Sequence, residues 1–169
     1  MNKNKEIRIE KVTLNIGAGG SAELVNKGLK LLQAITGIKP VKTVTTKRIP
    51  TWGVRPGLAI GCKVTVRGKK AEELLKRLLK AKESRLLGRN FDNQGNFSFG
   101  IKEYLDIPNV KYDHEIGIMG LDTAVTLQRA GFRVKNRRLE PKKLPPKHRI
   151  STEEAIEFVK NAFGIEVEE

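Results

Sequence analysis

The sequence contains a single cysteine, Cys62, and so cannot form an internal disulfide or a zinc site built from several thiolates. Its longest run without a charged residue covers only residues 12–22, far short of the roughly 20 apolar residues that cross a bilayer. The lysines near the start are followed by no apolar signal segment. These absences exclude disulfide-stabilised scaffolds and membrane spans, and they predict a soluble, cytoplasmic protein.

Acidic residues are scarce in two particular segments. The chain carries 33 Lys and Arg against 19 Asp and Glu, which gives a formal net charge of +14. No acidic residue occurs from Leu24 to Ala71, which holds eleven basic ones, and the segment from Arg129 to Arg149 has nine basic residues against Glu140 alone. A merely solvated surface mixes both signs, whereas such segregation is typical of surfaces that neutralise a polyanion. We interpret the two segments as two phosphate-binding surfaces.

Hydrophobic periodicity divides the chain into strands and helices. Strands are predicted at residues 7–16, 41–47, 58–67, 96–99 and 121–127, and helices at residues 22–36, 69–82 and 151–164. Ser21 is expected to cap the first helix, whose apolar stripe includes Leu24, and Gly37 to end it. Ser151 and Glu154 predict a capping box at the start of the last helix. The apolar phase slips between Ile9 and Val12, which indicates a bulge. Prolines among lysines predict an extended basic arm at about residues 133–149. We expect one α+β domain over residues 1–169, with an antiparallel or mixed sheet, helices on one face and an exposed RNA-binding face.

Strand alternation places polar and basic side chains on the outward face of this sheet. The outward candidates from the three most basic strands are Lys11, Thr13, Asn15, Thr43, Thr45, Lys47, Lys63, Thr65 and Arg67. Those from the arm are Arg133, Lys135, Arg137 and Arg138. Cations, hydroxyls and an amide suit the phosphates and 2′-hydroxyls of RNA. An ordinary solvated face is the alternative, but such a face usually mixes glutamate with lysine.

Two motifs resemble enzyme sites. Residues 17–22 read GAGGSA between a strand and a helix, as in dinucleotide-binding proteins. That site also needs an acidic residue about 20 positions later, and none occurs between Glu23 and Glu72. Residues 112–115 combine an imidazole with two carboxylates, but neighbouring side chains point apart. We therefore predict no catalytic site, no metal site and no cofactor, with a nucleotide-binding enzyme as the alternative function.

Trp52 lies in a loop between Pro50 and Pro56, outside any periodic apolar segment that would form the core. Two interpretations remain open, namely that the ring anchors the loop or that it stacks on a partner. Cys62 lies on the apolar side of its predicted strand, and we interpret it as part of the core rather than as a nucleophile.

Five ordered motifs resemble the ribosomal protein L5 family. They are KVTLNIGAGG, TGIKPVKT, RPGLAIGCKVTVRG, FDNQGNFSFGIKEY and YDHEIGIMGLD, and they extend over most of the chain. The later segments AGFRVKNRR and KLPPKHRIS resemble the archaeal and eukaryotic branch of that family.

The resemblance implies a structural constituent of the large ribosomal subunit. Such a protein binds 5S rRNA on its sheet and helps attach it to the large-subunit rRNA in the central protuberance. It also contacts P-site tRNA and the small-subunit ribosomal protein S13. By position, the family's polar sheet residues fall on Asn15 and Thr65. Its tRNA-facing loop falls on about residues 49–61, which include Trp52, Arg55 and Gly57.

Two positions depart from the family pattern. Ile38 stands where the family commonly has glutamine, so this chain lacks an amide that could contact RNA there. Pro56 stands where the family commonly has an acidic residue, which makes the loop stiffer and removes its negative charge.

Overall fold

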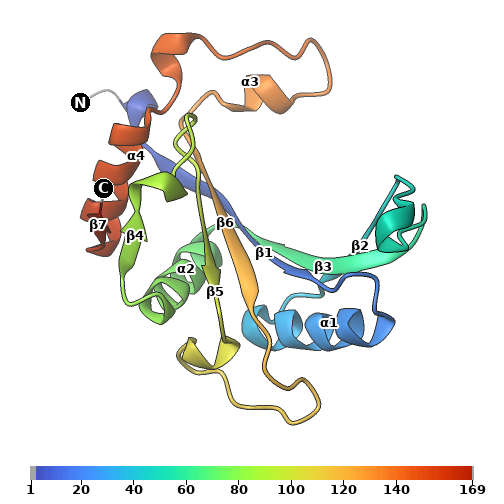
Figure 1. Cartoon of the computed structure of the whole chain (residues 1–169). Helices are drawn as coiled ribbons and strands as arrows, with labels where there is room; N and C mark the ends of the chain where they lie inside the picture. Colours follow the sequence, from blue (N-terminus) through green and yellow to red (C-terminus); the bar gives the residue numbers. More distant parts are fainter. Residues whose placement is uncertain (1–2, 169) are drawn as a thin grey trace.

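A computed structural model describes residues 3–168, and its centre is a five-stranded antiparallel sheet (Figure 1). The strands lie in the order β2-β3-β1-β6-β5. Their bounds are β1 Arg8–Gly17, β2 Val41–Val44, β3 Ala59–Val66, β5 Phe97–Ile101 and β6 Leu121–Gln128. Each neighbouring pair is antiparallel. The predicted α+β class is confirmed, and the main sheet is antiparallel rather than mixed.

The helices α1 (Ala22–Thr36) and α2 (Lys69–Ala81) pack against one face of this sheet. Their apolar stripes bury Val25, Leu31 and Leu75 among others against the inward residues of β1 and β3. Ser21 caps α1 by accepting a hydrogen bond from the Leu24 amide, and Gly37 ends it in the left-handed conformation, as predicted. Leu24 itself is 42% exposed, so its expected place in the stripe was wrong.

Helix α1 lies unusually close to the sheet at Gly28. A Cβ atom added there would come within 2.7 Å of the Cys62 sulfur. Cys62 is fully buried, and this burial raises the pKa of its thiol. The predicted core position of Cys62 is therefore confirmed, and the neutral thiol acts as a small apolar side chain.

The predicted irregularity in the first strand is a bulge at Glu10. Ile9 pairs with Leu127 and Lys11 with Thr126, so Glu10 has no partner on β6. The extra residue lies beyond the part of β1 that pairs with β3, which begins at Val12.

A smaller parallel sheet pairs β4 (Arg85–Leu87) with β7 (Glu166–Glu168) next to helix α4 (Thr152–Phe163). The predicted capping box at the start of α4 is present, and Gly164 ends the helix. Short 3₁₀ turns complete the described chain at Lys3–Lys5, Pro50–Trp52, Gly88–Asn90, Tyr104–Asp106 and Pro146–His148.

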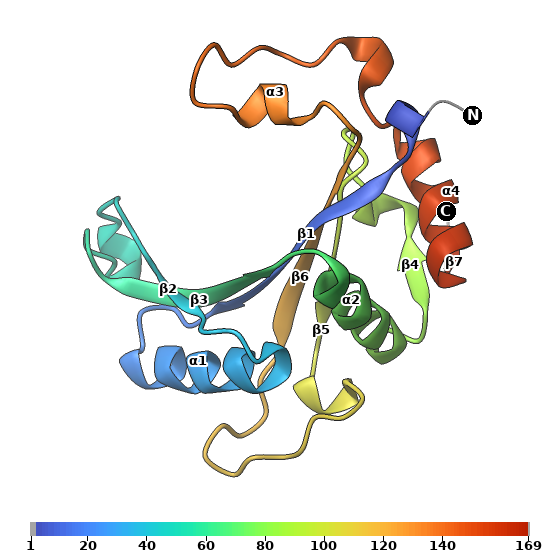
Figure 2. The same cartoon turned by 180° about the vertical axis from the view of Figure 1, so that it is seen from behind.

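Most expected boundaries agree with the structure to within one or two residues, and two segments differ more. The second strand ends at Val44 instead of residue 47. The backbone of Thr45 still bonds to Gly57 and Leu58, and the Thr45 hydroxyl bonds to the main chain of Lys47, which turns the chain after Thr45 into the loop. The arm, predicted as extended at about residues 133–149, covers residues 130–150 between β6 and α4, and it contains the short helix α3 (Arg133–Asn136). In both views α1 lies on one side of the sheet and the arm on the other (Figures 1 and 2).

Candidate RNA-binding surface

Two adjacent rows of polar side chains cross the exposed face of the sheet. Lys63 on β3 lies opposite Asn15 on β1, and Thr65 lies opposite Thr13. All four are exposed or half-buried, whereas the alternate residues Val12, Leu14 and Val64 are buried. Directly opposed side chains in a sheet lie about 5 Å apart. Backbone pairing thus brings an ammonium, an amide and two hydroxyls from distant segments onto one surface, which we call the polar face.

Some of the other predicted sheet residues lie beside the polar face, and others lie beyond the end of β2. Lys11 is half-buried opposite Thr126, Thr43 lies beside Gly61, and Arg67 is exposed one residue beyond β3. Thr45 and Lys47 lie beyond the end of β2, which the sequence predicted to reach residue 47. The Thr45 hydroxyl is already bonded to the Lys47 main chain at 3.1 Å.

The contribution of β6 to this surface was not predicted. Its outward residues include Asp122 opposite Asn15, together with Thr126 and Gln128. The expectation of a face without acidic residues is therefore wrong. Strict alternation over residues 121–127 already gave the outward orientation of Asp122 and Thr126, but only the pairing of β6 with β1 shows that they lie beside the basic residues of β1 and β3.

Backbone hydrogen bonds and the buried side chain of Val54 stabilise the loop between β2 and β3, and the tryptophan does not. The amides of Ile49 and Val54 each donate to the carbonyl of the other, at 2.9 and 3.1 Å, and Val54 is buried. Trp52 is 74% exposed, so its ring does not anchor the loop. Arg55 and Gly57 are also exposed, and Gly57 has φ +83°. The indole and guanidinium are therefore accessible to a partner.

The four arm candidates Arg133, Lys135, Arg137 and Arg138 are all exposed. Two of them also shape the arm. The Arg137 Nε donates to the Glu140 carbonyl at 2.9 Å, and the Lys135 ammonium donates to the Gln94 side chain at 3.4 Å. Accessible cations on a folded arm are suited to contacts with phosphate.

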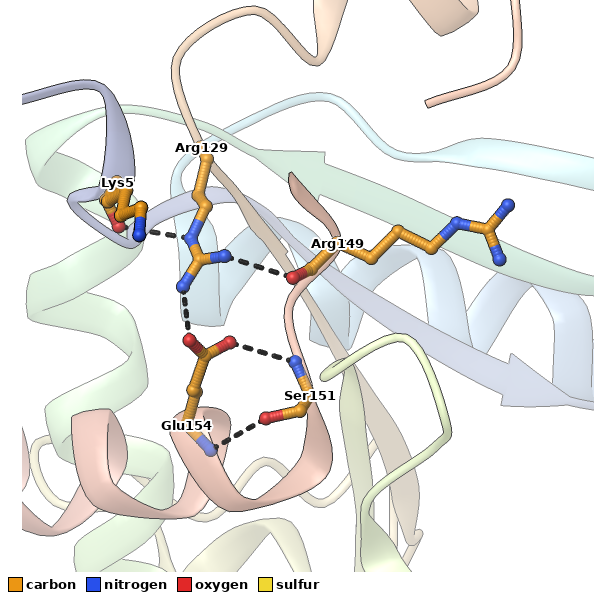
Figure 3. Close-up of polar contacts among 5 residues, drawn as sticks. All are labelled: Lys5, Arg129, Arg149, Ser151 and Glu154. Atoms are coloured by element: carbon orange, nitrogen blue, oxygen red, sulfur yellow. Dashed lines mark hydrogen bonds and ion pairs between the residues drawn. The ribbon is translucent and has the colours of Figure 1, made fainter. Parts of the chain in front are cut away.

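Arg129 is a structural residue (Figure 3). It lies in the second basic segment, which we interpreted as phosphate-binding. It is 7% exposed, and its guanidinium donates to three partners. These are the carbonyls of Lys5 at 3.0 Å and Arg149 at 2.9 Å, and the carboxylate of Glu154 at 2.8 Å. Arg129 thereby joins the two ends of the arm to the start of the chain and to α4.

The Glu154 carboxylate completes this cluster. One oxygen accepts from Arg129 and the other from the Ser151 amide at 3.0 Å (Figure 3). The bond from the Ser151 amide, and next the bond from Arg129, lower the pKa of Glu154. The carboxylate therefore stays ionised at neutral pH, where it stabilises α4 and the base of the arm.

The two enzyme-like motifs form ordinary connections. Gly19 and Gly20 adopt positive φ in the turn from β1 into α1. Residues 112–115 lie in an exposed loop, where Glu115 pairs with Lys30. Across residues 3–168 no group of His, Cys, Asp and Glu is arranged to hold a metal ion. Within the same range no helix is long and apolar enough to cross a membrane.

Two family models match the chain. The model described as ribosomal protein L5 matches residues 2–55, and the model for the C-terminus of the same ribosomal family matches residues 59–158. Together they account for most of the sequence.

Curated relatives match over nearly their whole length. A protein of Sulfurisphaera tokodaii named large ribosomal subunit protein uL5 is 49% identical, with 100% of this chain and 96% of the relative covered. Proteins of the same name from Methanosphaera stadtmanae and Nanoarchaeum equitans are 44% and 47% identical. Those alignments cover 99% and 96% of this chain, and 100% and 96% of the relatives.

Proposed function

Since this chain belongs to the ribosomal protein L5 family, we propose that it binds 5S rRNA through the polar face and helps attach it to the large-subunit rRNA in the central protuberance. Members of the family are structural constituents of the large ribosomal subunit, not enzymes. The alternative of a nucleotide-binding enzyme at residues 17–22 is therefore excluded. The ribosome-bound protein would work in the cytoplasm and without a cofactor.

The observation that carries the proposal is the pairing of Lys63 with Asn15 and of Thr65 with Thr13 on the exposed face. Apolar residues are absent from these two opposed pairs, so the surface offers donors and acceptors at close spacing. Hydroxyls and amides reach 2′-hydroxyls while the ammonium binds phosphate. The net charge of +14 favours the same partner.

Further contacts are proposed for the projecting segments. The arm, with Arg133 and Arg138 accessible, would bind large-subunit rRNA. The loop carrying Trp52 and Arg55 would face the P-site tRNA, and the protein would contact the small-subunit protein S13. Arm and loop project from different parts of the sheet (Figures 1 and 2), so each could meet a separate partner.

Removing single polar groups from the polar face tests the main proposal. We expect Thr65→Val and Asn15→Ala each to weaken 5S rRNA binding by about 1–3 kcal/mol, because RNA groups left unpaired in the interface lose their hydrogen bonds. Both side chains point away from the core, so the fold should persist. Equilibrium binding of the purified variants, with circular dichroism as the check on folding, measures the effect.

The matched control is Asn26→Ala, at an exposed position on α1 on the other side of the sheet. It should bind 5S rRNA with unchanged affinity. Equal affinities for the wild type, Asn15→Ala and Thr65→Val would show that the polar face does not bind 5S rRNA.

The loop proposal gives a different result. Changing Trp52 and Arg55 together to Ala should speed the dissociation of P-site tRNA while leaving 5S rRNA affinity almost intact, because both side chains lie on the projecting loop and not on the polar face. Ribosomes carrying the double variant allow tRNA dissociation to be measured by filter binding. The control pair Trp52→Phe and Arg55→Lys keeps an aromatic ring and a charge, so it should retain more tRNA. Unchanged tRNA retention would refute this role, and a large loss of 5S rRNA affinity would assign the loop to the other RNA.

A further inference from the structure

A cavity of about 450 Å³ lies where the arm passes over the outward side of β6. Thr126 and Gln128 form part of its floor, continuing the polar face beyond Lys11, which pairs with Thr126. Leu144 and Phe132 from the arm provide apolar walls. The volume is within the range of about 300–1,000 Å³ that small ligands occupy. A space of this size accommodates one nucleotide and excludes a helical stem.

The aromatic wall is held in a fixed orientation. The Phe132 ring contacts His148 edge to face, with ring centroids 5.7 Å apart. His148 is itself fixed by a 2.7 Å hydrogen bond between its Nε2 and the Ala130 carbonyl. Phe132 remains partly exposed toward the cavity that it lines. A positioned aromatic side chain of this kind is the usual stacking partner of an unpaired RNA base.

The cavity combines cations with one carboxylate. Arg133, Lys143 and Arg149 contribute to its lining and can neutralise a phosphate. Glu10 also lines it, although a carboxylate there would repel phosphate. Its side chain is only 24% exposed, and its ion pair with the Lys11 ammonium is long, at 3.8 Å. The bulge in β1 leaves Glu10 unpaired with β6 and free to face the cavity.

A carboxylate in this position has a specific chemical preference. It only accepts hydrogen bonds, through two oxygens side by side. Guanine presents two neighbouring donors, N1–H and the N2 amino group, on its Watson–Crick edge. Adenine and cytosine each combine one amino group with an acceptor on that edge, and uracil has a single donor between two acceptors. Glu10 therefore matches guanine better than any other base.

We propose that this cavity binds a single unstacked guanine nucleotide of ribosomal RNA. The base stacks on Phe132, its Watson–Crick edge faces Glu10, and its phosphate lies at the cations of the arm. The inference rests on the proposed function only in taking ribosomal RNA as the source of the nucleotide.

Titrating the isotopically labelled full-length protein with GMP, AMP, CMP and UMP, and following backbone amides by NMR, tests the proposal. GMP should shift the signals of residues 126–128 and 132–133 and bind at least about fivefold more tightly than the others, as expected for one additional hydrogen bond. Glu10→Gln should remove this preference, because its amide replaces one acceptor with a donor. The control Glu72→Gln, at an exposed position on α2, should keep it.

Two results would overturn the proposal. One is the absence of saturable shifts at residues 126–133 with GMP, and the other is an equal preference for GMP in the wild type and Glu10→Gln. Because free nucleotides are the probes, the outcome is separate from that of the polar face. Unchanged 5S rRNA affinity in Asn15→Ala, with GMP selectivity retained, would reject the polar-face proposal alone.

Discussion

Raising the salt concentration from about 50 to about 200 mM is expected to weaken 5S rRNA binding by about 10³–10⁵-fold, a scale taken from proteins that contact six to ten phosphates of duplex DNA. The reason is that each cation bound to phosphate releases condensed counterions, so the affinity follows the salt concentration steeply. Lys63 and Arg67 are exposed on or beside the polar face, with Lys11 partly exposed. No acidic residue lies between Leu24 and Ala71, and Asp122, which β6 places opposite Asn15, offsets these cations only in part.

Plots of log affinity against log salt concentration measure this effect directly. Replacing Lys63 and Arg67 together with Gln should reduce the magnitude of the slope by about 2, or about 1 for each phosphate-binding cation removed. The matched control replaces Lys76 and Lys80 on α2, on the helical side of the sheet, and should keep the wild-type slope. A nearly flat dependence for the wild type would mean that phosphate binding adds little to the stability of the complex.

Arg129→Met is expected to reduce the free energy of unfolding by about 2–4 kcal/mol, because one change removes three hydrogen bonds from a buried guanidinium. The carbonyls of Lys5 and Arg149 lose their partner, and Glu154 loses its ion pair. Methionine fills a similar space, so the effect reports the polar interactions rather than a cavity. Urea unfolding gives the free energy. The control Arg133→Met, at an accessible position of the arm, should change it by no more than about 0.5 kcal/mol.

The same cluster predicts the sign of an acid effect. The pKa of Glu154 is lower in the folded chain than its ordinary value, so its ionised form stabilises the fold. This contribution is complete above the ordinary glutamate pKa of about 4.3 and is lost as the pH falls from there through the lower folded pKa. Arg129→Met should therefore lose less stability on acidification than the wild type over this range. Parallel acid unfolding curves for the two proteins would contradict the assigned role of Arg129.

The parts of the fold that depend on local sequence were predictable. Alternation over residues 58–67 gave the orientation of β3, the phase slip gave the bulge, and Ser151 with Glu154 gave the start of α4. Each depends on residues a few positions apart. The position of Asp122 beside Asn15 depends instead on which strands pair, and alternation within one strand carries no information about that.

The candidate surface was predictable to a similar extent. Thr13, Asn15, Lys63 and Thr65 were correctly placed outward because burial on the opposite side of each strand fixes their phase. Arg129 was misassigned because counting charge does not distinguish an exposed guanidinium from one that is buried among carbonyl oxygens. The second strand was predicted too long because its weak polar pattern concealed the turn that the Thr45 hydroxyl makes with Lys47.

Because the Arg129 side chain donates to the Arg149 carbonyl, the length of the arm can change without changing the fold of the domain. This hydrogen bond holds the two ends of the arm together. Residues inserted or deleted at its tip therefore change only the entropy cost of closing the loop. Each doubling of a flexible loop costs only about 0.6 kcal/mol. Natural variation can thus lengthen or shorten the reach of the arm toward the RNA proposed as its partner while the sheet and its helices remain unchanged.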